Sequence, residues 1–259
     1  MVATLLGKVA LVTGASSGIG AVTSELLASN GVSLSLTGRN EENLLCTKAK
    51  CIEKGLKQDQ ILTTCADVTK ESELKMLVEQ TTEKFGKIDI LINNAGISAN
   101  EVTIRGPIEV YDKIMDVNVR GVIILTKLCL PALEETRGVV VNVSSLSGLR
   151  PLSFNMYYSI SKAALDQFTQ CLALEMAPKG VRVNSVNPGI VRTDFWTNKG
   201  LSPEEASKMI AGSVKMHPLG RVAEPEDVAK SILFLASEDS GFTTGQLLSI
   251  DGGRNLVTY

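Results

Sequence analysis

The sequence predicts an α/β fold in which about seven parallel strands form a doubly wound sheet with helices on both faces. Short runs of β-branched and aliphatic residues alternate along the chain with longer segments of helical periodicity. The short runs are almost continuously apolar, which is typical of strands buried on both faces. No linker or low-complexity stretch divides the chain, so we expect one domain over residues 1–259, connected by right-handed crossovers.

Taken in order, the elements follow from these patterns. The segments expected as strands are Lys8–Thr13, Val32–Thr37, Ile61–Ala66, Asp89–Ile92, Gly138–Val143, Val181–Val186 and Leu247–Ile250. The segments expected as helices are 19–30, 41–54, 71–85, 107–133, 155–178 and 225–236. The stretch 192–220 interrupts the alternation with a loop and a short helix starting near Pro203. It follows the sixth strand, at the end of the sheet where α/β proteins bind ligands, so we expect it to be a lid.

Composition excludes several function classes. Apolar residues make up 44% of the 259 residues and charged residues 21%, as in ordinary globular proteins. The net charge of -2 gives no basic excess that would indicate nucleic acid or an anionic membrane as a partner. The first residues do not read as a signal peptide, no apolar stretch is long enough to span a bilayer, and the last residues carry no lipidation or peroxisomal signal. We therefore expect a cytoplasmic protein.

Cysteine and histidine usage argues against disulfides and metals. The cysteines are odd in number, lack CxxC spacing and lie in apolar or helical stretches, so we expect buried thiols in a reducing compartment: Cys46, Cys51, Cys65, Cys129 and Cys171. The single histidine, His217, leaves too few ligands for a metal site and is expected to be a solvated loop residue. A serine hydrolase is also disfavoured, because no GxSxG elbow is present.

A glycine-rich turn follows the first expected strand and opens the first helix, with the sequence Thr13-Gly14-Ala15-Ser16-Ser17-Gly18-Ile19-Gly20. Gly14 allows the tight turn, Gly18 allows the backbone to approach a pyrophosphate, and Gly20 allows close packing of helix and strand. The helix N-terminus then offers free N–H groups and a positive dipole to an anion. The spacing is GxxxGxG and not GxGxxG, so a purely structural turn is the alternative when this motif is considered alone.

Several motifs together resemble the classical short-chain dehydrogenase/reductase family. They are the turn Thr13–Gly20, Asp67-Val68, Asn93-Asn94-Ala95-Gly96, Asn118, Tyr158-Ser159-Ile160-Ser161-Lys162, Asn187-Pro188-Gly189 and Asp251-Gly252-Gly253. The resemblance covers nearly the whole chain and is strongest to the branch with 3-oxoacyl carrier-protein reductases and carbonyl reductases. It implies a Rossmann-type fold, a nicotinamide cofactor, and hydride transfer to or from a carbonyl/secondary alcohol pair.

The expected catalytic pair is Tyr158 and Lys162, which are four residues apart and so share a helix face. A nearby ammonium should lower the pKa of Tyr158 toward the range useful for acid–base catalysis. The resemblance implies that Lys162 also binds the nicotinamide ribose. It further implies that Ser145, thirteen residues before Tyr158, binds the substrate oxygen, with Ser144 as the competing choice that the spacing disfavours. Asn118 would complete the set by kinking a helix and holding a water of a proton relay.

The resemblance also implies the cofactor contacts. The pyrophosphate turn would use Gly14, Ser16, Ser17, Gly18, Ile19 and Gly20. Asp67 would accept from the adenine amino group with Val68 beside it, while Asn94, Ala95 and Gly96 would brace the sheet first and line the adenosine side second. The nicotinamide side would be formed by Tyr158, Lys162, Pro188, Gly189 and Val191, with Thr193 reaching the carboxamide or phosphate.

The end of the second strand predicts the choice of cofactor. An NAD enzyme of this architecture needs an acid there, but the chain has Gly38 followed by Arg39. An arginine can bind a 2′-phosphate with paired hydrogen bonds. We therefore expect NADP(H) to be preferred, with NAD(H) possible. The alternative is that Arg39 is a solvated turn residue drawn toward Glu41 and Glu42.

The predicted function is an NADP(H)-preferring oxidoreductase acting on a medium-sized hydrophobic carbonyl or alcohol, such as a ketone, steroid, retinoid or 3-oxoacyl compound. Apolar lid residues favour such a substrate, although they could equally pack the lid onto the body: Phe195, Trp196, Leu201, Met209, Ile210 and Met216. Helices 107–133 and 155–178 are apolar on more than one face, which predicts a homo-oligomer. The family resemblance implies a tetramer, in which these helices pair across a two-fold axis and the C-terminal segment makes a second contact. The alternative function is an inactive dinucleotide-binding protein, which would be expected to lack Tyr158 or Lys162.

Overall fold

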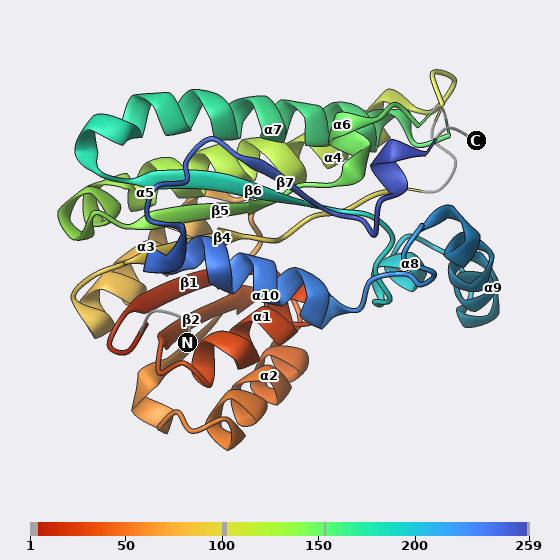
Figure 1. Cartoon of the computed structure of the whole chain (residues 1–259). Coiled ribbons are helices and arrows are strands. Elements are labelled where there is room, and N and C mark those ends of the chain that lie inside the picture. Colours follow the sequence, from red (N-terminus) through yellow and green to blue (C-terminus); the bar gives the residue numbers. More distant parts are fainter. Residues whose placement is uncertain (1–4, 100–102, 153, 258–259) are drawn as a thin grey trace.

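The computed structural model describes residues 5–99, 103–152 and 154–257. A parallel sheet runs through its centre, with strands in the order β3-β2-β1-β4-β5-β6-β7 (Figure 1). The strands are β1 (Val9–Thr13), β2 (Ser33–Gly38), β3 (Ile61–Cys65), β4 (Ile90–Asn93), β5 (Val139–Val143), β6 (Arg182–Pro188) and β7 (Leu247–Ile250). Each strand predicted from the sequence is found, and the doubly wound parallel sheet is confirmed.

Helices cover both faces of the sheet, which explains why its strands are apolar throughout. One face carries α1 (Gly18–Ala28), α2 (Glu41–Glu53) and α10 (Pro225–Ala236), and the other carries α3 (Glu71–Phe85), α5 (Gly121–Thr136) and α7 (Met156–Met176). Successive strand residues point to opposite faces, so Val12 packs in the first core and Leu11 in the second. Every residue of β1, β4 and β5 is buried.

The predicted helix 107–133 is one helical run with a wider turn in its middle. It consists of α4 (Ile108–Met115), a π-helical turn at Asp116–Arg120, and α5. Asn118 lies in this turn and is fully buried. Turns of this kind disturb the regular hydrogen-bond ladder and are frequent at functional sites.

The predicted lid after β6 contains α8 (Phe195–Asn198) and α9 (Pro203–Ser213). Helix α9 extends away from the sheet at the right of Figure 1, and Ser202 caps its first turn with Glu205. A small hydrophobic cluster is formed by Ile210 of the lid and by Ile190 and Val222, which flank the lid, with Trp196, Met209 and Met216 among the packed neighbours. Most of the apolar lid residues therefore pack on one another and on these flanking residues.

The structure corrects two expectations about single residue types. His217 is not a solvated loop residue: it is 3% exposed, and its Nδ1 lies 2.8 Å from the carbonyl oxygen of Ser213. Glycines at 189 and 252 approach its ring, so the chain can close over it. Of the cysteines, only Cys51 and Cys129 are buried, because the other three lie on outward faces.

Two further properties concern the described residues as a whole. No helix among them is both long and apolar enough to cross a membrane. Nor do three or more potential metal ligands cluster within that part of the chain.

Candidate active site

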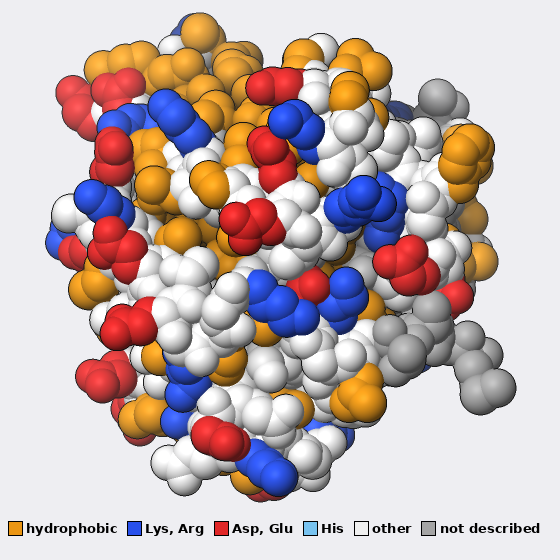
Figure 2. Space-filling model, turned by 90° about the vertical axis from the view of Figure 1, so that its left-hand side faces the viewer, with side chains coloured by type: hydrophobic (Ala, Val, Ile, Leu, Met, Phe, Trp, Pro, Cys, Tyr) orange, Lys and Arg blue, Asp and Glu red, His pale blue; other side chains and the backbone are white. Residues whose placement is uncertain are grey.

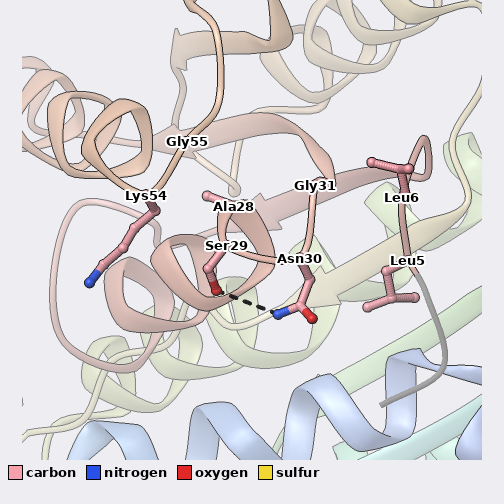
Figure 3. Close-up of a pocket in the computed structure, with 8 residues that line it drawn as sticks. All are labelled: Leu5, Leu6, Ala28, Ser29, Asn30, Gly31, Lys54 and Gly55. Atoms are coloured by element: carbon pink, nitrogen blue, oxygen red, sulfur yellow. Dashed lines mark hydrogen bonds between the residues drawn. The ribbon is translucent and has the colours of Figure 1, made fainter. Parts of the chain in front are cut away.

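The predicted site residues meet at the carboxyl edge of the sheet. This edge is where the turns after β1, β2, β3, β4, β5 and β6 come together, because the strands are parallel. A separate hollow at the opposite edge is lined by residues 5–6, 28–31 and 54–55, which precede β1, β2 and β3 (Figure 3). In Figure 3 this hollow presents backbone turns, with Asn30 bonded to Ser29 and the Lys54 amine pointing outward. It carries none of the predicted catalytic or cofactor residues, so the carboxyl edge is the candidate site.

The glycine turn after β1 is shaped by close backbone contacts. Gly14 and Gly18 have φ values of +62° and +54°, which side chains rarely adopt. A Cβ on Gly20 would lie 2.3 Å from the Gly14 carbonyl oxygen and 2.4 Å from Asn94 Nδ2. Asn94 in turn donates to the carbonyls of Thr13 and Gly14 at 2.9 and 3.1 Å. The turn can therefore hold its shape only with glycine at these positions.

The neighbouring turn after β4 supports the glycine turn. The backbone N–H groups of Asn94 and Ala95 both donate to the Thr13 hydroxyl at 2.9 Å. Asn94 and Ala95 therefore brace the sheet, as expected. Gly96 follows them and faces the catalytic residues, since a Cβ there would lie 3.4 Å from both Asn118 Oδ1 and Lys162 Nζ.

The N-terminus of α1 fits an anionic ligand. Ser17 is its N-cap residue but makes no side-chain capping bond, and the first turn, which contains Ile19, has no acidic residue. Helices α2, α3, α9 and α10 all have acidic first turns. The free N–H groups and the dipole of α1 therefore meet no carboxylate from their own helix. Thr193, which begins the lid, lies 3.3 Å from the position of a Cβ on Gly18 and so borders the same turn.

The turn after β2 carries the residues expected to choose the cofactor. Arg39 is exposed and forms no ion pair with Glu41 or Glu42, contrary to the alternative in which they draw it away. A Cβ on Gly38 would lie 3.0 Å from the Ser16 hydroxyl, which leaves little room for a side chain. Ser16 thus sits between the phosphate turn and the end of β2.

Asp67 and Val68 lie after β3, on the same edge. Burial raises the pKa of Asp67, but two hydrogen bonds from Thr69 and the nearby Arg39 guanidinium outweigh it, so the net shift is downward. Both Thr69 bonds are accepted by Oδ1, at 2.8 and 2.9 Å. Asp67 is therefore an anion with one oxygen available to a further donor. Val68 packs through its carbonyl against Gly121, where a Cβ would approach to 2.5 Å.

Tyr158 and Lys162 are brought together on the buried face of α7. Lys162 Nζ lies 5.6 Å from the centre of the Tyr158 ring and donates to the Val143 carbonyl at 2.8 Å. Ser145 is hydrogen-bonded to Tyr158, and its hydroxyl also accepts from the Ser147 N–H at 3.1 Å. The structure thus brings Ser145 to Tyr158, whereas Ser144 is buried and donates to the Lys162 carbonyl at 3.3 Å.

The neighbouring Tyr157 points elsewhere. Its hydroxyl donates to the Gly106 carbonyl at 2.9 Å, and its ring meets Tyr111 edge-on. The Tyr157 hydroxyl is therefore engaged outside the Tyr158–Lys162 pair.

Asn118 joins three elements beside Lys162. Its Oδ1 accepts from the Ile97 N–H at 2.8 Å, and its Nδ2 donates to the Ile97 carbonyl at 2.9 Å and to the Ser161 hydroxyl at 3.0 Å. Ser161 donates to the Tyr158 carbonyl at 2.7 Å. The π-helical turn is therefore tied both to the strand end after β4 and to the catalytic helix.

The protein alone does not lower the pKa of Tyr158, contrary to the sequence-based expectation. Burial raises this pKa to about 12, opposed by the hydrogen bond with Ser145 and reinforced by the charge of Asp166. Burial also lowers the pKa of Lys162 to about 8, an effect that Asp166 opposes. The expectation failed because it counted the ammonium and left out the desolvation that both groups share.

Asp166 is the residue that sequence reasoning missed. It is buried one helical turn after Lys162, and both its oxygens accept from Asn187 Nδ2, at 2.9 and 3.0 Å. A signal was present: positions 158, 162 and 166 share one helix face, and an aspartate on a buried face needs partners. Its partner Asn187 comes from a strand that the sequence could not place next to it.

The turn after β6 borders the same edge of the sheet. Pro188 is buried at the end of β6, and Gly189 approaches Asp251, whose Cβ would lie 3.1 Å from a Cβ at position 189. Val191 is buried, pairs with Ala223, and accepts from the Trp196 indole N–H at 2.9 Å. These contacts fix the start of the lid. The Phe195 ring then lies against Tyr158, with 5.9 Å between ring centres.

Comparisons with known proteins agree with this arrangement. The family described as enoyl-(acyl carrier protein) reductase matches residues 14–255. A 3-oxoacyl-(acyl-carrier-protein) reductase of Thermotoga maritima is 38% identical over 252 residues, covering 96% of this chain and 98% of the relative. Levodione reductase of Leifsonia aquatica is 34% identical over 254 residues, covering 96% and 95%. The crystal structure of a Caenorhabditis elegans short-chain dehydrogenase/reductase of unknown function with cofactor superposes with a TM-score of 0.95 at 36% identity, covering 98% of this chain and 97% of that one.

Proposed function

The chain belongs to the short-chain dehydrogenase/reductase family, and on that premise we propose that it is an NADPH-dependent reductase of hydrophobic carbonyl compounds. The observation that carries the proposal is the meeting of Tyr158, Ser145 and Lys162 at the carboxyl edge of the sheet. The alternative of an inactive dinucleotide-binding protein gains nothing from this arrangement, because such a protein has no need for a buried tyrosine–lysine pair.

The residues of the edge fit a dinucleotide. The cradle formed by Gly14, Gly18 and Gly20 would hold the pyrophosphate against the free N–H groups of α1. Asp67 would accept from the adenine amino group, and Pro188, Gly189, Val191 and Thr193 would border the nicotinamide. Lys162 would bind the nicotinamide ribose. When bound, the cofactor supplies the hydride that the carbonyl carbon accepts.

The chain's own residues handle the oxygen of the substrate. Ser145 donates a hydrogen bond to this oxygen as negative charge develops on it. Tyr158 then donates its proton to the same oxygen, which completes the alcohol. Lys162 stabilises the resulting phenolate through its positive charge. Asn118 holds the π-helical turn beside Lys162, where we place the water of a proton relay that reprotonates the tyrosine.

The ionisation of Tyr158 favours the reductive direction. With a pKa of about 12, the hydroxyl stays protonated at neutral pH and is ready to act as a proton donor. Alcohol oxidation would need the phenolate, which is only a very small fraction of the protein under those conditions. The protonated form of Tyr158 that the folded chain favours is therefore the form that carbonyl reduction requires.

The preference for NADPH rests on Arg39. Its guanidinium is exposed at the end of β2, has no ion pair with the neighbouring glutamates, and is close enough to Asp67, the proposed adenine contact, to lower the pKa of that carboxyl. No carboxylate stands at Gly38 to bind a ribose or repel a 2′-phosphate. NAD(H) remains a weaker substrate in this proposal, because nothing else at the turn excludes it.

The substrate class rests on Phe195. Of the lid residues that sequence reasoning named, it is the one whose ring contacts Tyr158, while Trp196, Met209, Ile210 and Met216 belong to the hydrophobic cluster of the lid and its flanking residues. A planar or apolar group next to the reacting carbonyl would pack on this ring. We therefore keep a hydrophobic ketone, steroid, retinoid or 3-oxoacyl compound as the proposed substrate.

We also propose that the protein is a cytoplasmic homotetramer. The outward faces of α5 and α7 expose large apolar side chains, with Ile123 at 41% and Leu174 at 81%. Figure 2 shows hydrophobic side chains gathered toward the top of that view, the side on which α7 lies in Figure 1. Pairing of such faces across a two-fold axis would bury them.

The experiment that tests the function compares Tyr158→Phe with Tyr157→Phe. Reduction of a panel of ketones and 3-oxoacyl thioesters is followed by NADPH absorbance, and cofactor binding is followed by NADPH fluorescence. Tyr158→Phe should lower kcat by at least about a hundredfold, the scale of one general acid, while NADPH still binds. Tyr157→Phe loses a hydrogen bond of similar kind and should keep turnover. A wild-type protein that binds NADPH but reduces no member of the panel would favour the inactive alternative.

A further inference from the structure

The proposed mechanism leaves one buried charged group without a task. Asp166 lies on α7, on the same face as Tyr158 and Lys162, and is 4% exposed. A carboxylate is almost never buried to this degree unless other groups pay for its desolvation, since burial disfavours the anion strongly. Its partners therefore indicate what it does.

The hydrogen bonds of Asp166 lead to the segment that carries Ser145. Asn187 Nδ2 donates to both carboxylate oxygens at 2.9 and 3.0 Å, and the same nitrogen lies 3.1 Å from the Ser145 carbonyl. The orientation of the Asn187 amide is fixed by a second hydrogen bond, which its Oδ1 accepts from the Ser185 hydroxyl at 2.6 Å. Ser144 lies close enough to the carboxylate to act on its pKa, although its hydroxyl donates to the Lys162 carbonyl. Asn187 therefore links the Asp166 carboxylate, on the catalytic helix, to the backbone of Ser145.

The turn after β5 packs directly against the Asp166 carboxylate. It continues into the short helix α6 (Leu146–Leu149), in which a Cβ on Gly148 would lie 2.2 Å from Asp166 Oδ2 and 2.9 Å from the Lys162 carbonyl. Only glycine permits this approach. The position of Ser145, at the N-cap of α6, is therefore set by contact with α7 at Asp166.

The charge of Asp166 acts on the two ionisable groups that face it. These are Lys162 and Tyr158 on its own helix; the neighbours from β6 and the β5–α6 turn are Asn187, Ser185 and Ser144, which stay neutral. A negative charge favours the ammonium and disfavours the phenolate, so it raises the pKa of both groups. Burial pushes the pKa of Lys162 the other way, so that Asp166 opposes the loss of the ammonium.

We propose that Asp166 is a positioning residue for carbonyl reduction, whose negative charge keeps Lys162 protonated beside Tyr158 and whose hydrogen bonds with Asn187 fix Ser145. The proposal rests on the proposed function for its kinetic consequence, but the charge interaction itself exists in the protein without substrate. Two substitutions separate the two tasks. Asp166→Asn keeps the size and an acceptor for Asn187 but removes the charge, whereas Asp166→Glu keeps the charge but displaces the carboxylate.

The kinetic test measures kcat/KM for reduction against pH. In the wild type, kcat/KM should fall on the alkaline side of the profile with a midpoint near the Lys162 pKa of about 8; this fall is called the alkaline limb. In Asp166→Asn it should move toward acid by about one pH unit, the scale of one buried charge pair. Asp166→Glu should keep the wild-type limb while kcat falls, because Ser145 is displaced. Thr169→Val is the matched control, since Thr169 is a fully buried polar residue in the next turn of α7, bonded to Leu165 and Asn142, and carries no charge.

A second readout needs neither substrate nor cofactor. The phenolate absorbance of Tyr158 is obtained as the difference between each protein and its Tyr158→Phe counterpart during an alkaline titration. Asp166→Asn should ionise Tyr158 at lower pH than the wild type, and Thr169→Val should not. This titration decides the proposal even if no carbonyl substrate is turned over, so its failure is distinct from failure of the proposed function.

Each outcome counts for or against the proposal. Acidward movement of both titrations in folded Asp166→Asn, with neither moved in Thr169→Val, supports it. An unchanged limb and an unchanged Tyr158 titration in folded Asp166→Asn would overturn it, as would an equal shift in Thr169→Val. If Asp166→Asn does not fold, Asp166→Ser replaces it, because the smaller side chain brings no unpaired amide into the core. Failure of both neutral variants to fold would show a purely structural carboxylate and would also overturn the proposal.

Discussion

Replacing Gly20 by alanine should damage both the fold and cofactor binding, although alanine is the better helix former. Gly20 lies in the first turn of α1, and an added Cβ would meet the Gly14 carbonyl oxygen at 2.3 Å and Asn94 Nδ2 at 2.4 Å. Helix and turn would have to separate, which breaks the bonds from Asn94 to the carbonyls of Thr13 and Gly14. The damage would fall on the proposed pyrophosphate cradle itself.

The magnitude follows from three opposing contributions. Overpacking costs about 1–3 kcal/mol, and two lost hydrogen bonds cost about 1 kcal/mol each. Helix propensity returns about 1 kcal/mol. The net loss in the free energy of unfolding is about 2–4 kcal/mol, which lowers Tm by roughly 5–15 °C in a protein of this size. Thermal unfolding and NADPH fluorescence titration measure the two effects.

Gly212→Ala is the matched control for this substitution. Gly212 is also helical, in α9, but it is exposed and an added Cβ would have nothing within 4 Å. The same chemical change should therefore raise stability by about 0.5–1 kcal/mol through helix propensity alone and leave NADPH affinity unchanged. If Gly20→Ala were as stable as Gly212→Ala and bound NADPH normally, the close packing of this turn would not be what requires glycine.

The remaining predictions concern pH, cofactor and assembly. For the wild type, kcat/KM for reduction should be level below about pH 8 and fall above it as Lys162 loses its charge, while Tyr158 stays protonated; a profile that falls only near pH 12 would contradict this. Arg39→Leu should reduce the preference for NADPH over NADH, measured as the ratio of kcat/KM values, by about ten- to a hundredfold. Equal use of both cofactors by the wild type would refute that assignment. Light scattering should show a tetramer of 27.7 kDa subunits and a smaller species for Leu174→Glu, whereas a wild-type monomer would exclude the proposed assembly.

The positions of the strands along the chain and the pairing of Tyr158 with Lys162 could be predicted because both depend on short-range patterns. A strand buried on both faces has a nearly continuous run of apolar residues in its sequence, as in Val139–Val143. A pair separated by four residues in a helix faces one way, as Tyr158 and Lys162 do. In each case the deciding geometry lies within one element, so the local sequence is sufficient.

Properties that depend on packing between elements could not be predicted. His217 looked like a loop residue because the burial comes from the turns at Gly189 and Gly252, distant in sequence. The lid looked like a hydrophobic substrate pocket, yet most of its apolar side chains pack against one another, and Phe195 is the one that contacts Tyr158. Composition indicates that such residues are apolar but not which surface covers them.

Burial of the proposed catalytic lysine destabilises its charged form in the folded protein. Lowering the pKa of Lys162 from 10.5 to about 8 corresponds to roughly 3 kcal/mol against the charged form in the folded state. The unfolded chain therefore binds this proton more tightly, and the contribution of Lys162 to stability improves as pH rises from about 8 toward 10.5. An ammonium that is unfavourable at neutral pH persists because it donates to the Val143 carbonyl and faces Asp166. Asp166 in turn is held by Asn187 from β6, so the charge required beside Tyr158 is maintained by the strand order of the sheet.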